Sequence, residues 1–308
     1  MKVEEWKVSL HGGHSGDFCE HASGTLREIL EAAVRFGYHT FGVSEHVSRV
    51  EERFLYPEEI AKGWTVERVD SDFERYEEAI TPLAHEFADR LTVLRGFECE
   101  VVPSENYIGR MKAIRDRRLP DGTSAFDYCV GSVHYVDEFQ VDGSPASLAE
   151  TVAAFGSLET VAVRYYETVA AMVEAVRPDV VGHLDLIKKN VIRGGMDVTE
   201  ITTERVQIAA RAALEAVREH GAILDLNTAG RRKGLGEPYP APWLVRQAQS
   251  MGIGFCFGDD SHRPSEVGAG LADARTYLLE NGVTHITALT REGEIGAGNI
   301  SQCRISLE

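Results

Sequence analysis

Residues 180–185 read Val-Val-Gly-His-Leu-Asp, a short apolar run that ends in a histidine and an aspartate. A helical pattern precedes this run at Val161–Val176, and another follows at Thr203–Glu219, where Thr202 and Thr203 are candidate caps and Gly221 is a candidate stop. Apolar runs that alternate with helical patterns are typical of strands in a buried parallel sheet. We therefore expect residues 180–185 to form one strand of an α/β fold.

Six other segments have the same character and are expected to be strands: Lys7–His11, Thr40–Glu45, Leu91–Glu98, Tyr128–His134, Ala222–Asn227 and Ile253–Asp259. Further helical patterns lie between them at Thr25–Phe36 and Asp72–Ala88. About seven strand–helix units favour a closed or nearly closed barrel over an open sheet. No domain boundary is apparent, so residues 1–308 are expected to form a single barrel domain. The stretches Val47–Asp70 and Val136–Leu158 read as long loops, each a candidate lid.

Composition narrows the possible functions. The chain has 308 residues, 43% of them hydrophobic, and a formal net charge of -17. That charge disfavours binding to a nucleic-acid backbone but allows a small anionic substrate, because metal ions can reverse the local sign. No apolar run reaches the ~18 residues that a membrane span needs, and the N-terminus has no secretory pattern. Five scattered cysteines without a C-x-x-C pair fit a reducing compartment, so we expect a cytoplasmic protein.

Histidines and carboxylates follow the ends of the expected strands. They are His11, His14, His46, Glu98, His134, His183, Asp185, Asp259, Asp260 and His262, with His21 in the first loop. In an α/β barrel the carboxyl ends of the strands meet at one face, and imidazole with carboxylate suits zinc, iron or manganese. The number of such groups predicts two or three metal ions that share Glu98.

Each of these residues also has a structural interpretation when it is taken alone. A single histidine at a strand end is more often structural than a ligand, Glu98 alone could be an ion-pair partner, and the pair Asp259–Asp260 could cap the next helix. Four histidines fall at strand starts or helix positions and are expected to be structural: His39, His85, His220 and His285.

The order of several short motifs identifies a family resemblance. The motifs are CEH at 19–21, SEH at 44–46, GFE at 96–98, DYCVGSVH at 127–134, VVGHLDLIKK at 180–189, NTAGRRK at 227–233 with EPYP at 237–240, and GDDSH at 258–262. From about Lys7 to Val267 the chain resembles the PHP family (polymerase and histidinol phosphatase). Within it, the NTAG and EPYP segments resemble monofunctional histidinol-phosphate phosphatases.

This resemblance implies a distorted (β/α)7 barrel, similar to a TIM barrel, that binds up to three divalent ions (zinc, iron or manganese). The implied ligands of the first ion are His11, His14, Glu98 and Asp260. Those of the second are Glu98, His134 and His183, so that Glu98 bridges the two ions. Those of the third are His21, His46 and His262.

The first motif departs from the family pattern. The family has one residue between the first two histidines, whereas Gly12 and Gly13 separate His11 from His14, and Ser9 stands where an aspartate is usual. Residues three apart in a plain strand do not share a face. We therefore expect a bulge or sharp turn with at least one glycine at positive φ. The alternative is that only one of the two histidines is a ligand.

The implied reaction is hydrolysis of histidinol phosphate, a small phosphorylated substrate, in histidine biosynthesis. Clustered ions would activate water and neutralise the phosphate oxygens. Arg232 is the first candidate for binding the phosphate, followed by its neighbours Arg231 and Lys233 and then by Lys188 and Lys189; the segment 231–233 could instead be a solvated loop. Asp260, His183 or a metal-bound water are the candidate leaving-group acids.

Two other functions fit the same residues. One is another metal-dependent hydrolase, such as a phosphodiesterase, a nuclease or an amidohydrolase-like enzyme. The other is a non-catalytic metal-binding protein that keeps the fold. Comparing the hydrolysis of a monoester, a diester and an amide would separate the hydrolases from one another.

Overall fold

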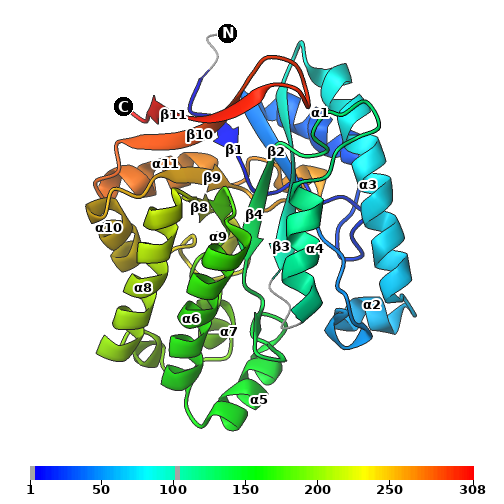
Figure 1. Cartoon of the computed structure of the whole chain (residues 1–308). Coiled ribbons are helices and arrows are strands. Elements are labelled where there is room, and N and C mark those ends of the chain that lie inside the picture. The colour runs from blue at the N-terminus through cyan, green and yellow to red at the C-terminus, as the bar shows by residue number, and fades with distance from the viewer. Residues whose placement is uncertain (1–3, 101–104) are drawn as a thin grey trace.

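Seven parallel strands form the central sheet of this protein, whose computed structural model describes residues 4–100 and 105–308 (Figure 1). In spatial order they are β1 (Val8–Ser9), β2 (Thr40–His46), β3 (Thr92–Glu100), β4 (Tyr128–Ser132), β7 (Val180–Val181), β8 (Ile223–Asn227) and β9 (Phe255–Gly258). Strands that are neighbours in this sheet are also consecutive among the sheet's strands along the chain, as in a barrel built from repeated strand–helix units.

The two outer strands of the sheet, β1 and β9, meet and nearly close it into a barrel. The backbone N–H of Leu10 donates to the carbonyl of Phe257 at 2.8 Å, and that of Asp260 donates to the carbonyl of His11 at 2.9 Å. The expected seven-stranded barrel is therefore confirmed.

Helices lie around the outside of the barrel and beyond the carboxyl ends of its strands (Figure 1). They are α1 (Leu26–Phe36), α2 (Pro57–Ala61), α3 (Val66–Phe87), α4 (Glu105–Arg115), α5 (Pro145–Phe155), α6 (Leu158–Val176), α7 (Lys188–Arg193), α8 (Glu204–His220), α9 (Ala229–Arg232), α10 (Pro242–Ser250) and α11 (Leu271–Glu280). In the described part of the chain no single helix is long and apolar enough to cross a membrane. Helices α5 and α6 reach that length and hydropathy only when they are taken together, and they are bent by 96° relative to each other.

The signals at the ends of α8 show how local sequence sets these helices. The side chain of Thr203 accepts a hydrogen bond from the N–H of Val206, and Gly221 ends the helix with φ 68°. The first satisfies an amide left free in the first turn, and the second is a left-handed conformation that glycine adopts readily. Both ends were predicted from the sequence to within a residue.

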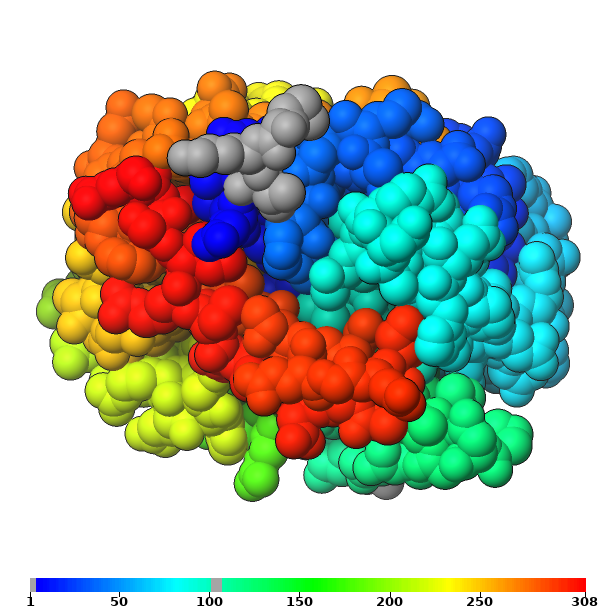
Figure 2. Space-filling view, turned by 90° about the horizontal axis from the view of Figure 1, so that it is seen from above, coloured from blue at the N-terminus to red at the C-terminus, as the bar shows by residue number. Residues whose placement is uncertain are grey.

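The C-terminal segment closes the end of the barrel where the strands begin. Strands β10 (His285–Glu292) and β11 (Asn299–Ser306) form an antiparallel hairpin, which lies across the face seen from above in Figure 2. Arg291 of this hairpin donates to the carbonyl of Val93 at 2.7 Å and to Asp127 at 2.5 Å, both near strand starts. The opposite end of the barrel is left open for a site.

Two expected loops are in fact structured. The stretch Val47–Asp70 holds a turn of 3-10 helix (Glu52–Phe54), all of α2 and the start of α3. The stretch Val136–Leu158 holds the end of β5 (Tyr135–Val136), then β6 (Phe139–Gln140) and α5. The signal for α5 was present in the sequence, because Ser144 caps the helix and Pro145 occupies its first turn.

Candidate active site

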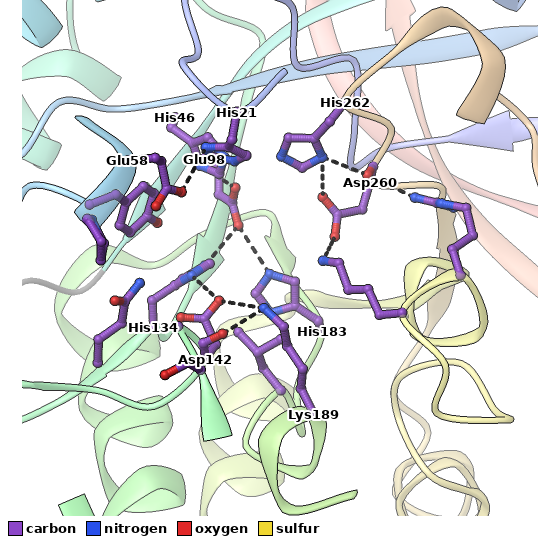
Figure 3. Close-up of a pocket in the computed structure, with 18 of the residues that line it drawn as sticks. His21, His46, Glu58, Glu98, His134, Asp142, His183, Lys189, Asp260 and His262 are labelled. Carbon is purple, nitrogen blue, oxygen red and sulfur yellow. Dashed lines mark hydrogen bonds and ion pairs between the residues drawn. The ribbon is translucent and has the colours of Figure 1, made fainter. Parts of the chain in front are cut away.

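Nine histidines and carboxylates converge at the carboxyl ends of the strands. Each belongs to at least one group whose nitrogen and oxygen atoms lie within 4.8 Å of one another. They are His11, His14, His21, His46, Glu98, His134, His183, Asp260 and His262. Figure 3 labels those that also line a pocket: His21, His46, Glu98, His134, His183, Asp260 and His262. The structure therefore brings together all nine residues that the family resemblance implies as ligands. Asp185 and Asp259, which the strand-end pattern also included, belong to none of these groups.

Glu98 lies at the centre of this cluster and is 1% exposed. One carboxylate oxygen is 3.3 Å from Nε2 of both His11 and His183, and 3.6 Å from Nε2 of His134. The other oxygen is 2.9 Å from Nδ1 of His46 and 3.9 Å from Nε2 of His14. Burial opposes the charge of Glu98, but His11 and His46 outweigh it and hold the pKa of Glu98 well below its ordinary value. The group is therefore a carboxylate that faces imidazoles on several sides.

The turn at Gly12 and Gly13 has the conformation that the spacing predicted. Their φ angles are 148° and 78°, both in the region that favours glycine. The N–H of Gly12 donates to Oγ of Ser44 at 3.0 Å, and the N–H of His14 donates to the carbonyl of Ser261 at 3.0 Å. As a result, Nε2 of both His11 and His14 faces Glu98.

Two further residues of the cluster have an unusual backbone. His183 has φ 25° and Asp260 has φ 47°, which non-glycine residues seldom adopt. The N–H of His183 is held by a carboxylate oxygen of Asp225 at 2.6 Å. Such conformations persist only where the surroundings impose them, and they gather at functional sites.

A second set of imidazoles lies beside Glu98. The rings of His21 and His262 are 4.8 Å apart between centroids, and the ring of His14 stacks on His46 at 4.2 Å and on His262 at 4.3 Å. Burial lowers the pKa of His262 to about 4, despite the nearby Asp260. Burial also lowers the pKa of His14, and His46 and His262 lower it further. At neutral pH His14 and His262 are therefore neutral, which is the form that binds a metal.

The donor set fits divalent metal ions. Buried ring nitrogens of His11, His14, His46, His134 and His183 have no hydrogen-bond partner within the described chain. Unpaired buried polar atoms are costly and are normally satisfied, so their gathering around one carboxylate calls for a bound group. Burial opposes a charge on His46, yet Glu98 and Glu100 raise its pKa to about 10, so the two carboxylates favour positive charge at this position.

The cluster opens into a pocket of about 640 Å3. Its walls include Tyr56, Pro57 and Glu58 from the first stretch expected to be a loop, and Ser144 and Ser147 from the second. Both stretches therefore contribute to the site, as structured walls. A pocket of this size suits a small molecule.

Three of the five candidate phosphate-binding side chains line this pocket: Arg232, Lys233 and Lys189. Arg232 donates to the carbonyls of Asp259 at 2.6 Å and Asp260 at 3.0 Å, and Nζ of Lys233 is 3.2 Å from Asp260. Nζ of Lys189 donates to the carbonyl of Asp142 at 2.7 Å.

The other two candidates do not line the pocket. Arg231 is on the same short helix as Arg232, but successive residues of a helix point in different directions, and Arg231 pairs with Asp273 at 3.1 Å outside the pocket. Lys188 is buried, with its ammonium 3.0 Å from Asp185 and 2.8 Å from Glu237. The structure therefore does not bring either side chain to the pocket.

The residues interpreted as structural do lie outside the clusters. Within the described chain His39, His85, His220 and His285 belong to no potential metal-binding group. Asp259 accepts from the hydroxyl of Tyr38 at 2.9 Å, and so holds a loop.

Three carboxylates that support the cluster were missed. Asp225 accepts from Nδ1 of His11 at 2.7 Å, and orienting a ring in this way leaves Nε2 free for a ligand role. Glu100 is 2.9 Å from His46, and Asp142 is 3.4 Å from His134. Glu100 is the last residue of β3, so the rule that found Glu98 applies to it too. Asp225 lies in the middle of β8, and Asp142 follows β6 in a turn, so the rule finds neither of them.

A parallel barrel with clustered imidazoles and carboxylates at its open end defines a metal-dependent hydrolase. The sequence profile of the PHP domain family matches residues 11–229, and the chain belongs to this family. The resemblance inferred from the motifs is thereby confirmed.

Named relatives point to one branch of the family. A protein of Deinococcus radiodurans, named as a probable histidinol-phosphatase, is 33% identical over 271 residues, 87% of this chain and 92% of that protein. One of Schizosaccharomyces pombe with the same name is 29% identical over 301 residues, 95% and 92% of the two chains. The crystal structure of a candidate histidinol phosphatase from Listeria monocytogenes is 26% identical with a TM-score of 0.73, covering 87% of this chain and 99% of its own.

Proposed function

We propose that this chain is a histidinol-phosphatase, which hydrolyses L-histidinol phosphate to histidinol and phosphate in histidine biosynthesis. The observation that carries the proposal is the convergence of imidazoles around the buried carboxylate of Glu98, with basic side chains in the same pocket. Membership of the PHP family and the names of the relatives support the same reaction and its substrate.

Two ions would share Glu98. His11, His14 and Asp260 would complete the first set, since Nε2 of His14 is 3.7 Å from Asp260 as well as near Glu98. His134 and His183 would complete the second set, and both approach the same oxygen of Glu98. Neutral imidazoles and carboxylates are ligands that zinc, iron and manganese accept.

A third ion would be held by His21, His46 and His262, which form a group of their own. Ions bound in these sites would activate a water for attack on phosphorus and would neutralise the phosphate oxygens. Asp260 and His183, which both line the pocket, are the chain's own candidates for delivering a proton to the leaving alcohol.

Arg232, Lys233 and Lys189 would bind the phosphate group. Their positive charges line the same pocket as the metal cluster, where bound divalent ions would add to them, in a chain whose formal net charge is -17. A concentrated positive charge attracts an anionic substrate. The carboxylates of Asp142, Glu58 and Glu266, which also line the pocket, would face the cationic amine of histidinol.

The test is phosphate release from L-histidinol phosphate, compared with a phosphodiester and with an amide under the same conditions. We expect the monoester to have the highest kcat/KM by a wide margin. A faster diester or amide would contradict the assignment as a monoesterase, and no hydrolysis by metal-loaded protein would indicate a binding protein instead.

A further inference from the structure

Cys19 lies beside the three histidines proposed for the third ion. Its Sγ is 3.4 Å from Nδ1 and 3.5 Å from Nε2 of His21. One potential ligand atom from each of Cys19, His21, His46 and His262 lies within 4.8 Å of the others. Among the described residues no other cysteine belongs to a potential metal-binding group.

The backbone fixes the thiol in this position. The N–H of Cys19 donates to the carbonyl of Ser15 at 2.9 Å, and the N–H of Ala22 donates to the carbonyl of Cys19 at 3.3 Å. The N–H of Ser23 then donates to the carbonyl of His262 at 2.8 Å, which joins this turn to the loop after β9. Cys19 is 7% exposed, so its thiol is held inside the site rather than on a mobile surface.

The surrounding nitrogens are available to a cation. Nε2 of His46 has no hydrogen-bond partner, and the side chain of His46 is 9% exposed. Nδ1 of His262 is 3.0 Å from the carbonyl of Asp260. Because a carbonyl only accepts, this contact assigns the proton to Nδ1 and leaves Nε2 of His262 as a lone-pair donor.

We propose that Cys19 is a ligand of the third ion, which makes the site one of three imidazoles and one thiolate. The proposal rests on the proposed function, since it assigns a further ligand to the same metal centre. When the ion binds, the thiol proton passes to solvent and the sulfur–metal bond forms, with no change of oxidation state. Tetrahedral zinc with bonds of about 2.3 Å to sulfur and 2.0–2.1 Å to nitrogen places S and N roughly 3.5 Å apart, the separation found between Cys19 and His21.

The thiolate gives this site a metal preference that the other two lack. Sulfur is a soft ligand that favours zinc over manganese or magnesium, whereas sets of imidazole and carboxylate accept several divalent ions. The third site should therefore retain zinc when manganese is in excess, whereas the two sites that share Glu98 should exchange zinc for manganese. Replacing the sulfur by oxygen should remove that preference.

Cobalt substitution tests this ligand without reference to activity. Wild-type protein loaded with Co2+ should show a thiolate-to-cobalt charge-transfer band in the near ultraviolet, and the Cys19→Ser variant should lose it. Cys303→Ser, on the hairpin at the other end of the barrel, is the matched control and should keep the band.

Zinc content after dialysis against excess manganese gives a second measurement. Wild type and Cys303→Ser should each retain zinc in one site, and Cys19→Ser should retain about tenfold less. If the charge-transfer band is absent from cobalt-loaded wild type, or persists in Cys19→Ser, then Cys19 is not a ligand. Either result leaves the phosphatase assignment unaffected. Failure of the wild type to bind any divalent ion would instead contradict the phosphatase assignment as well.

Discussion

At the scale of single residues, Glu98 is the side chain on which most of the site depends. Its two oxygens face five imidazoles from four segments of the chain, at 2.9 to 3.9 Å. A carboxylate in this position can bridge two ions. We therefore expect Glu98→Ala to lose more than one equivalent of metal, measured by elemental analysis of protein purified without chelator.

A buried carboxylate at the other end of the barrel supplies the control for Glu98→Ala. Asp127 is paired with Arg95 at 3.0 Å and touches no histidine of the cluster. The Asp127→Asn variant should be less stable but should keep its full metal content. Loss of a single equivalent from Glu98→Ala would contradict the bridging role.

Arg232 and Arg231 form a natural matched pair for the phosphate contact. Arg232 lines the pocket, whereas its neighbour pairs with Asp273 outside it. A charge-assisted contact to phosphate is worth roughly 1.5–3 kcal/mol, which is about ten- to a hundredfold in rate. We expect Arg232→Ala to lower kcat/KM for L-histidinol phosphate by that factor and Arg231→Ala to change it little. An equal loss of kcat/KM in both variants would contradict a phosphate contact that is specific to Arg232.

At the scale of elements, the turn at Gly12 decides whether both N-terminal histidines reach the site. A Cβ at this position would lie 2.4 Å from a carboxylate oxygen of Asp259 and 3.0 Å from the backbone nitrogen of Asp260. Gly12→Val should therefore displace the loop that carries Asp260 and reduce metal affinity, while circular dichroism shows a folded barrel.

Gly63 controls for the backbone conformation alone. It also has a positive φ, 68°, but nothing lies within 4 Å of a Cβ placed there. Gly63→Val should leave metal content unchanged. If Gly12→Val binds metal as wild type does, the turn is not what positions the histidines.

The sequence identified the elements that carry the site but not the length of each strand. β1 and β7 have only two paired residues each, although five and six were expected from Lys7–His11 and Val180–Asp185. The reason is the site itself, because the Gly12–Gly13 turn and the positive φ of His183 take the backbone out of the ladder. Apolar periodicity cannot anticipate a conformation that tertiary contacts impose.

The supporting contacts of the site were less predictable than the residues that face Glu98. The rule that reads polar residues at strand ends extends to Glu100, the last residue of β3, but not to Asp225, which lies in the middle of β8. Asp142 is different, because it reaches His134 from a turn between β6 and α5. The sequence also does not determine which way a side chain of a short helix points, and this direction is what places Arg232, but not Arg231, in the pocket.

At the scale of the whole molecule, the C-terminal hairpin and the barrel are joined through Asp127. Its carboxylate accepts from Arg291 of the hairpin at 2.5 Å and pairs with the fully buried Arg95. Removing one partner of a buried ion pair typically costs about 3–5 kcal/mol, because the other charge is left without compensation. We expect Asp127→Asn to lower the free energy of unfolding by about that amount at neutral pH, measured by urea denaturation.

The pH dependence of this effect has a defined sign. Burial opposes the charge on Asp127, but Arg95 and Arg291 hold its pKa below its ordinary value. A lowered pKa in the folded state stabilises the fold above the unfolded value of ~3.9 and loses that contribution as the pH falls through the folded pKa. The difference between wild type and Asp127→Asn should therefore shrink in acid. A difference that stays constant would show that the carboxylate charge is not what stabilises the junction.

The strand ends of this barrel are proposed to form a metal centre that hydrolyses a phosphate monoester. The most direct test is the rate of phosphate release from L-histidinol phosphate before chelation, after removal of metal, and after restoration of zinc, iron or manganese. We predict that activity disappears with the metal and returns when divalent ions rebind, in proportion to the equivalents bound. Full activity in protein shown by elemental analysis to be free of metal would contradict the proposal.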